Sequence, residues 1–156
     1  MSLRQELEAE QVQHLDLQRY CLVDKGTSVR DTLGRMRAEG GRTALITDGA
    51  ELVGIFTERD VMRRVITDPG ALDEPVEVVM TPRPVTVSPD TSAAEALWMM
   101  NDHHFRNLPV IGTQGDILGD MTYASIIQYL AARYPVEVLN RSPRPEQYPS
   151  KPEGGD

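Results

Sequence analysis

The chain contains an internal repeat, and this repeat restricts its fold more than any other feature of the sequence. The segment V-D-K-G-T-S-V-R-D-T-L-G-R-M from Val23 aligns with V-S-P-D-T-S-A-A-E-A-L-W-M-M from Val87, which lies 64 positions further on. Residues 42–46, R-T-A-L-I, align with residues 106–110, R-N-L-P-V, at the same offset. Repeats of this length indicate repeated structural units. The sequence therefore predicts two copies of one unit.

Each copy is predicted to fold as a strand, a helix, two strands and a second helix. The first helix of each copy begins with a serine followed three positions later by an acidic residue, Ser28 with Asp31 and Ser92 with Glu95, which is typical of a helix N-terminus. A unit of this size cannot cover both faces of its small sheet, so two units should pack through their sheets. The expected fold class is α+β, with two pseudo-symmetric strand–helix–strand–strand–helix units.

The repeat also sets the expected domain boundaries. The first unit spans residues 20–80, a proline-punctuated crossover occupies residues 68–84, and the second unit spans residues 85–134. Residues 1–19 are predicted to form a mostly polar helix with a rough apolar face. Residues 135–156 form a proline-rich tail that is expected to be extended or disordered.

Composition and charge exclude several classes of protein. The net charge of −8 argues against nucleic-acid binding and against anionic membranes, since both require a basic face. No apolar run approaches the roughly 20 residues of a membrane span, and the start of the chain is too polar for a signal peptide, so a cytoplasmic protein is expected. Cys21 is the only cysteine, which excludes an internal disulfide and a thiolate metal cage and favours a small buried apolar role.

The stretch G-I-F-T-E-R-D from Gly54 has two interpretations. As a structural joint, Thr57 is a helix N-cap and Asp60 closes a capping box. As a site, the same side chains face outward at a helix start that favours an anionic or polyhydroxylated ligand. The local pattern alone favours the joint.

Four motifs in the order of the repeat resemble a known family. They are G-I-F-T-E-R-D at Gly54, G-D-M-T-Y-A-S at Gly119, V-M-T-P-R-P-V-T-V from Val79 and F-R-N-L-P-V from Phe105. From Tyr20 to Tyr134 the chain resembles a tandem pair of cystathionine-beta-synthase (CBS) domains, known as a Bateman module. The resemblance implies two clefts between the units that bind adenosine-containing molecules such as AMP, ADP, ATP or S-adenosylmethionine.

The resemblance also implies a first cleft with named residues. Asp60 would accept hydrogen bonds from both ribose hydroxyls, and Thr57 would cap the helix beside the ribose or phosphate. Arg106 of the other unit, with His103 or His104, would meet the phosphates, because an arginine fork forms paired charge-assisted hydrogen bonds with phosphate. The alternative for Arg106 is a solvated surface side chain.

The second cleft departs from the family pattern. By the same resemblance it would be formed by Thr122 and Ser125, with Arg42 reaching from the first unit. Ser125 replaces the carboxylate that Asp60 supplies to the first cleft. This replacement should weaken the binding of a ribose about tenfold. Asp120 adds a negative charge nearby, so this cleft is expected to be the weaker nucleotide site, to be empty or to take another ligand.

Adenine would need an apolar slot in each cleft. The first slot is assigned to the segments that contain Cys21, Val23, Ala44 and Ile46, and the second to those that contain Val85, Val87, Leu108 and Val110. The alternative for each of these residues is a place in the core.

The expected function is regulatory: the module senses an adenosine nucleotide and signals through a homodimer or an unidentified effector protein. A structural dimerisation or interaction module without nucleotide is the alternative, and a small enzyme is the weakest hypothesis because no nucleophile, base or metal cluster is evident. No catalytic residue, metal or required cofactor is therefore predicted. A homodimer is expected from the apolar residues of the two second helices, which are Val61, Met62, Val65, Ile66, Ile126, Ile127 and Leu130.

Overall fold

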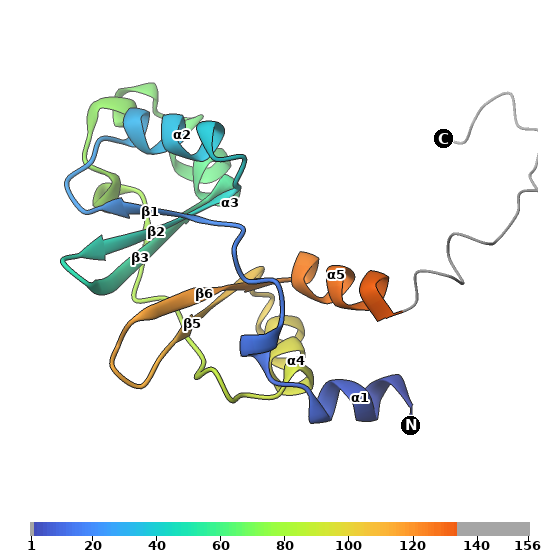
Figure 1. Ribbon diagram of the computed structural model, residues 1–156. Coiled ribbons are helices and arrows are strands. Elements are labelled where there is room, and N and C mark those ends of the chain that lie inside the picture. Colours follow the sequence, from blue (N-terminus) through green and yellow to red (C-terminus); the bar gives the residue numbers. More distant parts are fainter. Residues whose placement is uncertain (1, 134–156) are drawn as a thin grey trace, which may run out of the picture.

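A computed structural model describes residues 2–133 of the chain. The proline-rich tail expected over residues 135–156 lies outside the described residues. The described part forms two units, drawn one above the other in Figure 1, each with its own sheet and its own hydrophobic core. The α+β fold class and the two repeated units are thus confirmed.

The first unit follows the expected element order. Its elements are β1 (Cys21–Asp24), α2 (Val29–Ala38), β2 (Thr43–Asp48), β3 (Glu51–Thr57), α3 (Glu58–Asp60) and the π-helix η2 (Val61–Val65). Strand β1 pairs in parallel with β2, β3 is antiparallel to β2, and β4 (Thr81–Pro82) adds a short outer strand beside β3. The predicted cap is present, because the Ser28 hydroxyl accepts a hydrogen bond from the Asp31 backbone N–H at 3.0 Å.

The second unit repeats this order with one difference. Its elements are α4 (Ala93–His103), β5 (Asn107–Ile111), β6 (Ile117–Thr122) and α5 (Tyr123–Arg133). Ser92 caps α4 as Ser28 caps α2, accepting from the Glu95 N–H at 3.0 Å. The first strand expected in this unit is reduced to one parallel bridge between Val87 and Val110. The register of β5 and β6 pairs Asn107 with Thr122.

Each core is completed by the segment that precedes the other unit. In the crossover, the 3-10 helices η3 (Pro69–Asp73) and η4 (Val76–Val78) contribute Ala71 and Val76 to the core of the first unit. The N-terminal segment contains α1 (Leu3–Ala9) and the 3-10 helix η1 (Val12–His14), and it lies against the second unit beside α4 (Figure 1). Its buried residues in the second core are Leu7, Val12, Leu15 and Leu17.

The helix expected over residues 1–19 is therefore too long, because α1 ends at Ala9, and the segment packs on the second unit. After Glu10 the backbone turns extended and pairs with the second unit, where the Val12 N–H donates to the Thr91 carbonyl at 2.8 Å. The crossover makes the same bond one repeat later, from Val76 to Thr27, also at 2.8 Å. The two segments are also similar in sequence, E-Q-V-Q-H-L from Glu10 and E-P-V-E-V-V from Glu74, so they occupy equivalent positions of the repeat.

The glycine of each G-x-x-T motif marks a close approach between these segments and the sheets. A Cβ added at Gly54 would overlap the side chain of Met80, and one added at Gly119 would overlap Leu17. The backbone N–H after Gly119 also donates to the Leu17 carbonyl at 2.9 Å. A larger residue at either glycine would push the completing segment off its unit.

Within residues 2–133, no helix is long and apolar enough to cross a membrane.

Candidate functional site

The two units meet at equivalent positions of the repeat. The Asn107 side-chain amide, at the start of β5, donates to the Thr43 hydroxyl at the start of β2, at 2.9 Å. An operation that exchanges the units exchanges these two residues, so the bond lies close to the pseudo-twofold axis. Arg42 and Arg106 directly precede the bonded residues. The contact therefore places each arginine-bearing strand start against the sheet of the other unit.

The first candidate site, formed by Thr57, Asp60 and Arg106, is built around a buried carboxylate. Asp60 is 5% exposed, and its Oδ2 accepts from the Thr57 backbone N–H at 2.9 Å, with the Thr57 hydroxyl at 3.4 Å. Its Oδ1 accepts from the Thr81 hydroxyl at 3.0 Å. Asp60 thus holds the helix start and also ties the end of the crossover to the first unit.

Arg64 reinforces the same junction. Its Nη1 donates to the carbonyls of Val79 and Met80, at 2.9 Å each, and lies 3.8 Å from Asp60 Oδ1. The crossover is therefore held by Thr81 on the carboxylate and by Arg64 on the preceding backbone. A ligand hydroxyl at Oδ1 would share this acceptor with the Thr81 hydroxyl.

The second candidate site, formed by Thr122, Ser125 and Arg42, uses its hydroxyl internally. Ser125 is 1% exposed; its Oγ accepts from the Thr122 backbone N–H at 3.1 Å and donates to the Asp16 carbonyl at 2.6 Å. Ser125 thus ties the N-terminal segment to the second unit, as Asp60 ties the crossover to the first. Neither arrangement follows from the motif letters alone, because each depends on a segment distant in sequence.

The predicted phosphate-binding residues are exposed. Arg106, His103 and His104 lie on the surface at the turn before β5. The His103 ring stacks on Phe105 with centroids 5.2 Å apart, and His104 ends α4 in the left-handed conformation. Arg42 is 83% exposed in its side chain and lies 3.8 Å from Glu58 Oε2.

Most residues assigned to adenine slots are in the cores. The buried members of this set are Cys21, Val23, Ala44, Ile46, Val87, Leu108 and Val110. Val85 is 46% exposed. Burial also raises the pKa of the Cys21 thiol, so a thiolate nucleophile is disfavoured there. Ligand contacts by these segments stay a prediction, and Val85 is the member whose side chain offers surface.

Asp120 is a titratable group whose burial the sequence did not reveal. It is 1% exposed on β6, and its Oδ2 accepts from the same Asn107 amide at 2.7 Å. Burial raises the pKa of this carboxyl from 3.8 to about 7, while hydrogen bonds from Asn107 and the Leu108 backbone lower it by less. The carboxyl is therefore part of the contact between the units.

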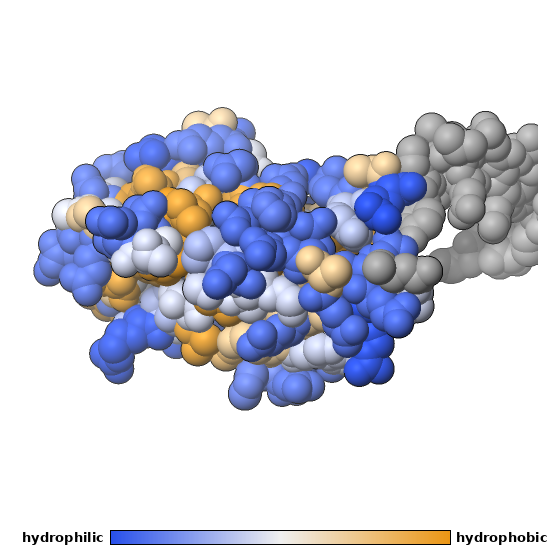
Figure 2. Space-filling view, turned by 60° about the horizontal axis from the view of Figure 1, so that its bottom comes forward, coloured by the Kyte–Doolittle hydropathy of each residue, from blue (hydrophilic) through white to orange (hydrophobic). Residues whose placement is uncertain are grey.

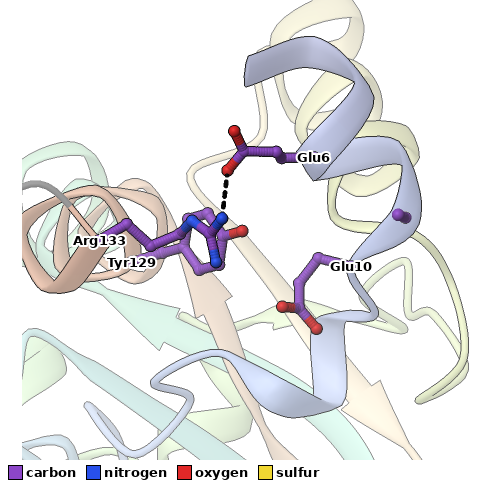
Figure 3. Close-up of a pocket in the computed structure, with 5 residues that line it drawn as sticks. Glu6, Glu10, Tyr129 and Arg133 are labelled. Atoms are coloured by element: carbon purple, nitrogen blue, oxygen red, sulfur yellow. Dashed lines mark ion pairs between the residues drawn. The ribbon is translucent and has the colours of Figure 1, made fainter. Parts of the chain in front are cut away.

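A pocket of about 190 Å³ lies between α1 and α5, away from both candidate sites. Figure 3 shows Arg133 reaching from α5 to Glu6 on α1, an ion pair of 2.8 Å, with Glu10, the residue after α1, on the same side of the pocket as Glu6. The Arg133 guanidinium also lies 5.6 Å from the centre of the Tyr129 ring. Sites for drug-sized ligands usually exceed about 300 Å³, so we interpret this pocket as the junction that docks α1. Within residues 2–133, no group of three or more His, Cys, Asp or Glu side chains could hold a metal ion.

Comparison with known proteins agrees with this geometry. The family model of the CBS domain matches residues 18–67 and 76–132, which are the two units of the structure. The chain belongs to the CBS domain family. A CBS domain-containing protein of Arabidopsis thaliana, CBSCBSPB5, is 37% identical over 124 residues, which cover 78% of this chain and 22% of the relative. This CBS pair thus spans about a fifth of the length of that relative.

Two solved structures share the fold. CBSX2 of Arabidopsis thaliana, solved in complex with AMP, superimposes with a TM-score of 0.68 at 21% identity, covering 80% of this chain and 98% of CBSX2. The cytosolic domain of the Mg2+ channel MgtE, in complex with ATP, gives a TM-score of 0.60 at 25% identity, covering 71% of this chain and 45% of that one. Both are CBS-type folds solved with an adenine nucleotide.

Proposed function

We propose that this CBS pair is a regulatory module that binds an adenine nucleotide between its units and reports binding to a partner or through its own dimer. The observation that carries the proposal is the 2.9 Å hydrogen bond from Asn107 to Thr43. Thr43 lies opposite Thr57 in the sheet register, so this bond brings the strand start that carries Arg106 towards the helix start that carries Asp60. The AMP and ATP bound by CBSX2 and MgtE support the ligand class.

Asp60 gives the proposed module a way to report binding. Its carboxylate holds the end of the crossover through Thr81, as well as the helix start. A ribose hydroxyl that hydrogen-bonds to Oδ1 shares this acceptor with the Thr81 hydroxyl and weakens that bond, so β4 is held less tightly against β3. Binding in the first candidate site is thus linked to the segment that joins the two units.

A thermal-shift screen of the full chain against adenosine, AMP, ADP, ATP and S-adenosylmethionine tests this function. A ligand at a hundred times its Kd adds about 2.7 kcal/mol to the free energy of unfolding, which corresponds to a rise in Tm of several degrees. If none of these compounds raises the Tm, the alternative of a structural or interaction module replaces the proposal.

Replacing Arg106 with alanine should weaken AMP, ADP and ATP about tenfold or more but leave adenosine almost unchanged, since the guanidinium acts on phosphate. Arg42→Ala is the matched control, because it removes the arginine at the equivalent position of the other unit. Calorimetry with AMP and adenosine measures both. An equal loss of affinity for adenosine and AMP in Arg106→Ala would contradict the assigned role.

We also propose that the module is a homodimer that pairs through its second helices. These helices leave large apolar side chains exposed: Met62 is 65%, Ile66 61% and Ile127 62% exposed. Such a surface favours association of two copies. Figure 2 shows that apolar side chains also gather in the left part of one face, the side where the β2–β3 and β5–β6 hairpins lie in Figure 1. A test must therefore compare the helices with another exposed apolar residue.

Met62→Glu combined with Ile127→Glu should convert the dimer to a monomer, since two charges would be buried on each side of the interface. Trp98→Glu is the matched control, because Trp98 is 50% exposed on α4, outside the second helices. Light scattering at several protein concentrations gives the result. A monomeric wild type would contradict the proposed dimer. Dissociation by Trp98→Glu alone would mean that the interface lies outside the second helices.

A further inference from the structure

A buried polar cluster joins the two units at the pseudo-twofold contact. The Asn107 amide donates both to Thr43 of the first unit, at 2.9 Å, and to Asp120 of the second, at 2.7 Å. The Asp120 backbone N–H donates to the Leu17 carbonyl at 2.9 Å. Asp120 is thus linked to the first unit through the Asn107 amide, from which its carboxyl accepts a hydrogen bond, and to the N-terminal segment through its own backbone N–H.

The repeat shows that this carboxyl is not needed to build the fold. In the first unit the position equivalent to Asp120 is Ile55, which directly follows Gly54 and is 8% exposed. The second unit therefore has an ionisable group where its twin has an aliphatic side chain. A buried carboxyl in place of a hydrocarbon destabilises a fold unless its polar atoms are satisfied, so its presence calls for a functional explanation.

The cluster is only partly satisfied. Among residues 2–133, the buried side-chain oxygens without a hydrogen-bond partner are Asp120 Oδ1 and Thr122 Oγ1. These residues are two positions apart on β6 and therefore face the same side of the strand. An ionised Asp120 would leave a charged oxygen without a donor there, whereas a protonated carboxyl is neutral and leaves no buried charge.

The surroundings supply no compensating positive charge. Asp120 is in no ion pair with a described residue, and its polar neighbours are the neutral Asn107 and Thr43 and the Leu108 backbone N–H. Tyr20, in the segment before β1, is a titratable group that interacts electrostatically with the Asp120 carboxylate. Burial raises the pKa of Tyr20 and the Asp120 charge raises it further, so the phenol stays protonated at neutral pH.

We propose that Asp120 makes the contact between the two CBS units proton-dependent: the protonated carboxyl closes the Asn107–Thr43 contact, and the ionised carboxyl loosens it. The module then responds to pH as well as to any ligand between its units. The twin position, Ile55, cannot respond in this way, so the response belongs to the second unit.

The direction of the pH effect follows from the pKa. Because the folded-state pKa of about 7 lies above the ordinary value of 3.8, the fold prefers the protonated carboxyl. The resulting stabilisation is complete below about pH 4 and is lost as the pH rises to about 7. Other carboxyl groups also affect stability in acid, so the effect is measured as the difference between wild type and a variant that does not titrate.

The first experiment follows thermal unfolding of the full chain from pH 5 to pH 8. Between these pH values the Tm of the wild type should fall by about 5–10 °C more than the Tm of Asp120→Asn. Asp120→Ile, which copies the first unit, should show the same smaller fall in Tm between pH 5 and pH 8 as Asp120→Asn. Asp116→Asn, in the exposed turn between β5 and β6, is the matched control and should follow the wild type.

The second experiment uses the wild type alone and does not depend on a variant folding. The side-chain carboxyl carbon of Asp120, followed by NMR, should titrate with a midpoint near pH 7, and the amide and methyl signals of Thr43 should change with the same midpoint. A midpoint near pH 4, or Thr43 signals that do not follow Asp120, would overturn the proposal. A pH profile of Asp120→Asn that matches the wild type would overturn it as well.

Discussion

Replacing Leu17 with alanine is expected to lower the free energy of unfolding by about 2–5 kcal/mol, the range for a buried leucine that leaves a cavity. Leu17 is 4% exposed in the core of the second unit, although it lies just before the first unit in the chain. It packs over Gly119 so closely that no Cβ fits between them, so the site cannot collapse far around a smaller side chain. Urea unfolding measures the change.

Leu3→Ala is the matched control for this substitution. Leu3 lies in the same N-terminal segment but is 42% exposed, so its truncation should change stability by less than about 1 kcal/mol. Equal effects of the two substitutions would mean that the segment does not complete the second core. Deleting residues 1–17 should be worse than Leu17→Ala alone, because the core would also lose Leu7, Val12 and Leu15.

Replacing Asp60 with asparagine should affect both binding and stability. Nucleotide affinity should fall about ten- to a hundredfold, because the amide lacks the charge that strengthens the bonds from ribose hydroxyls. The G-x-x-T-x-x-D motif alone suggests little effect on folding. The structure gives a different expectation, since the carboxylate accepts from Thr57 on one oxygen and from Thr81 on the other. An amide cannot accept on both, so a loss of about 1–3 kcal/mol is expected.

Thr81→Val separates these two effects. It keeps the shape of the side chain but removes the hydroxyl on Asp60 Oδ1. Stability should fall by about 1 kcal/mol, whereas nucleotide affinity should rise, since the ribose no longer competes with Thr81. Calorimetry measures the nucleotide affinity of Asp60→Asn and Thr81→Val, and urea unfolding measures the stability of both variants. If Thr81→Val weakens the nucleotide, the threonine supports the site and does not compete with the ligand.

Local patterns predicted much of this molecule. Ser28 and Ser92 begin helices as their spacing indicates, and the sheet pairs Thr43 with Thr57 in one unit as it pairs Asn107 with Thr122 in the other. Of the two interpretations of the stretch from Gly54, the structural joint is present, because Asp60 closes the helix start, and the ligand site stays a prediction. Such features depend on residues within a few positions of one another or on the repeat itself. Local spacing and repeats can both be recognised in a sequence.

Patterns over longer distances were missed or misjudged. The N-terminal segment looked like a polar helix because its apolar residues have no regular period, yet Val12 and Leu15 are core residues of the second unit. The similarity of E-Q-V-Q-H-L to E-P-V-E-V-V one repeat later was the available signal. Apolar residues in an extended segment follow the surface that they cover, so no helical spacing revealed them.

Sequence patterns were sufficient to predict that the chain forms two equivalent units, where the first helix of each unit begins, and which residues are equivalent between the units. Three features required the folded structure: each unit is completed by the segment preceding the other, Asn107 and Thr43 meet, and Asp120 is buried beside Asn107. The physical reason is that caps and periodicity act over a few residues of chain. Burial, and the pKa that follows from it, depends on which distant segments exclude water from a side chain.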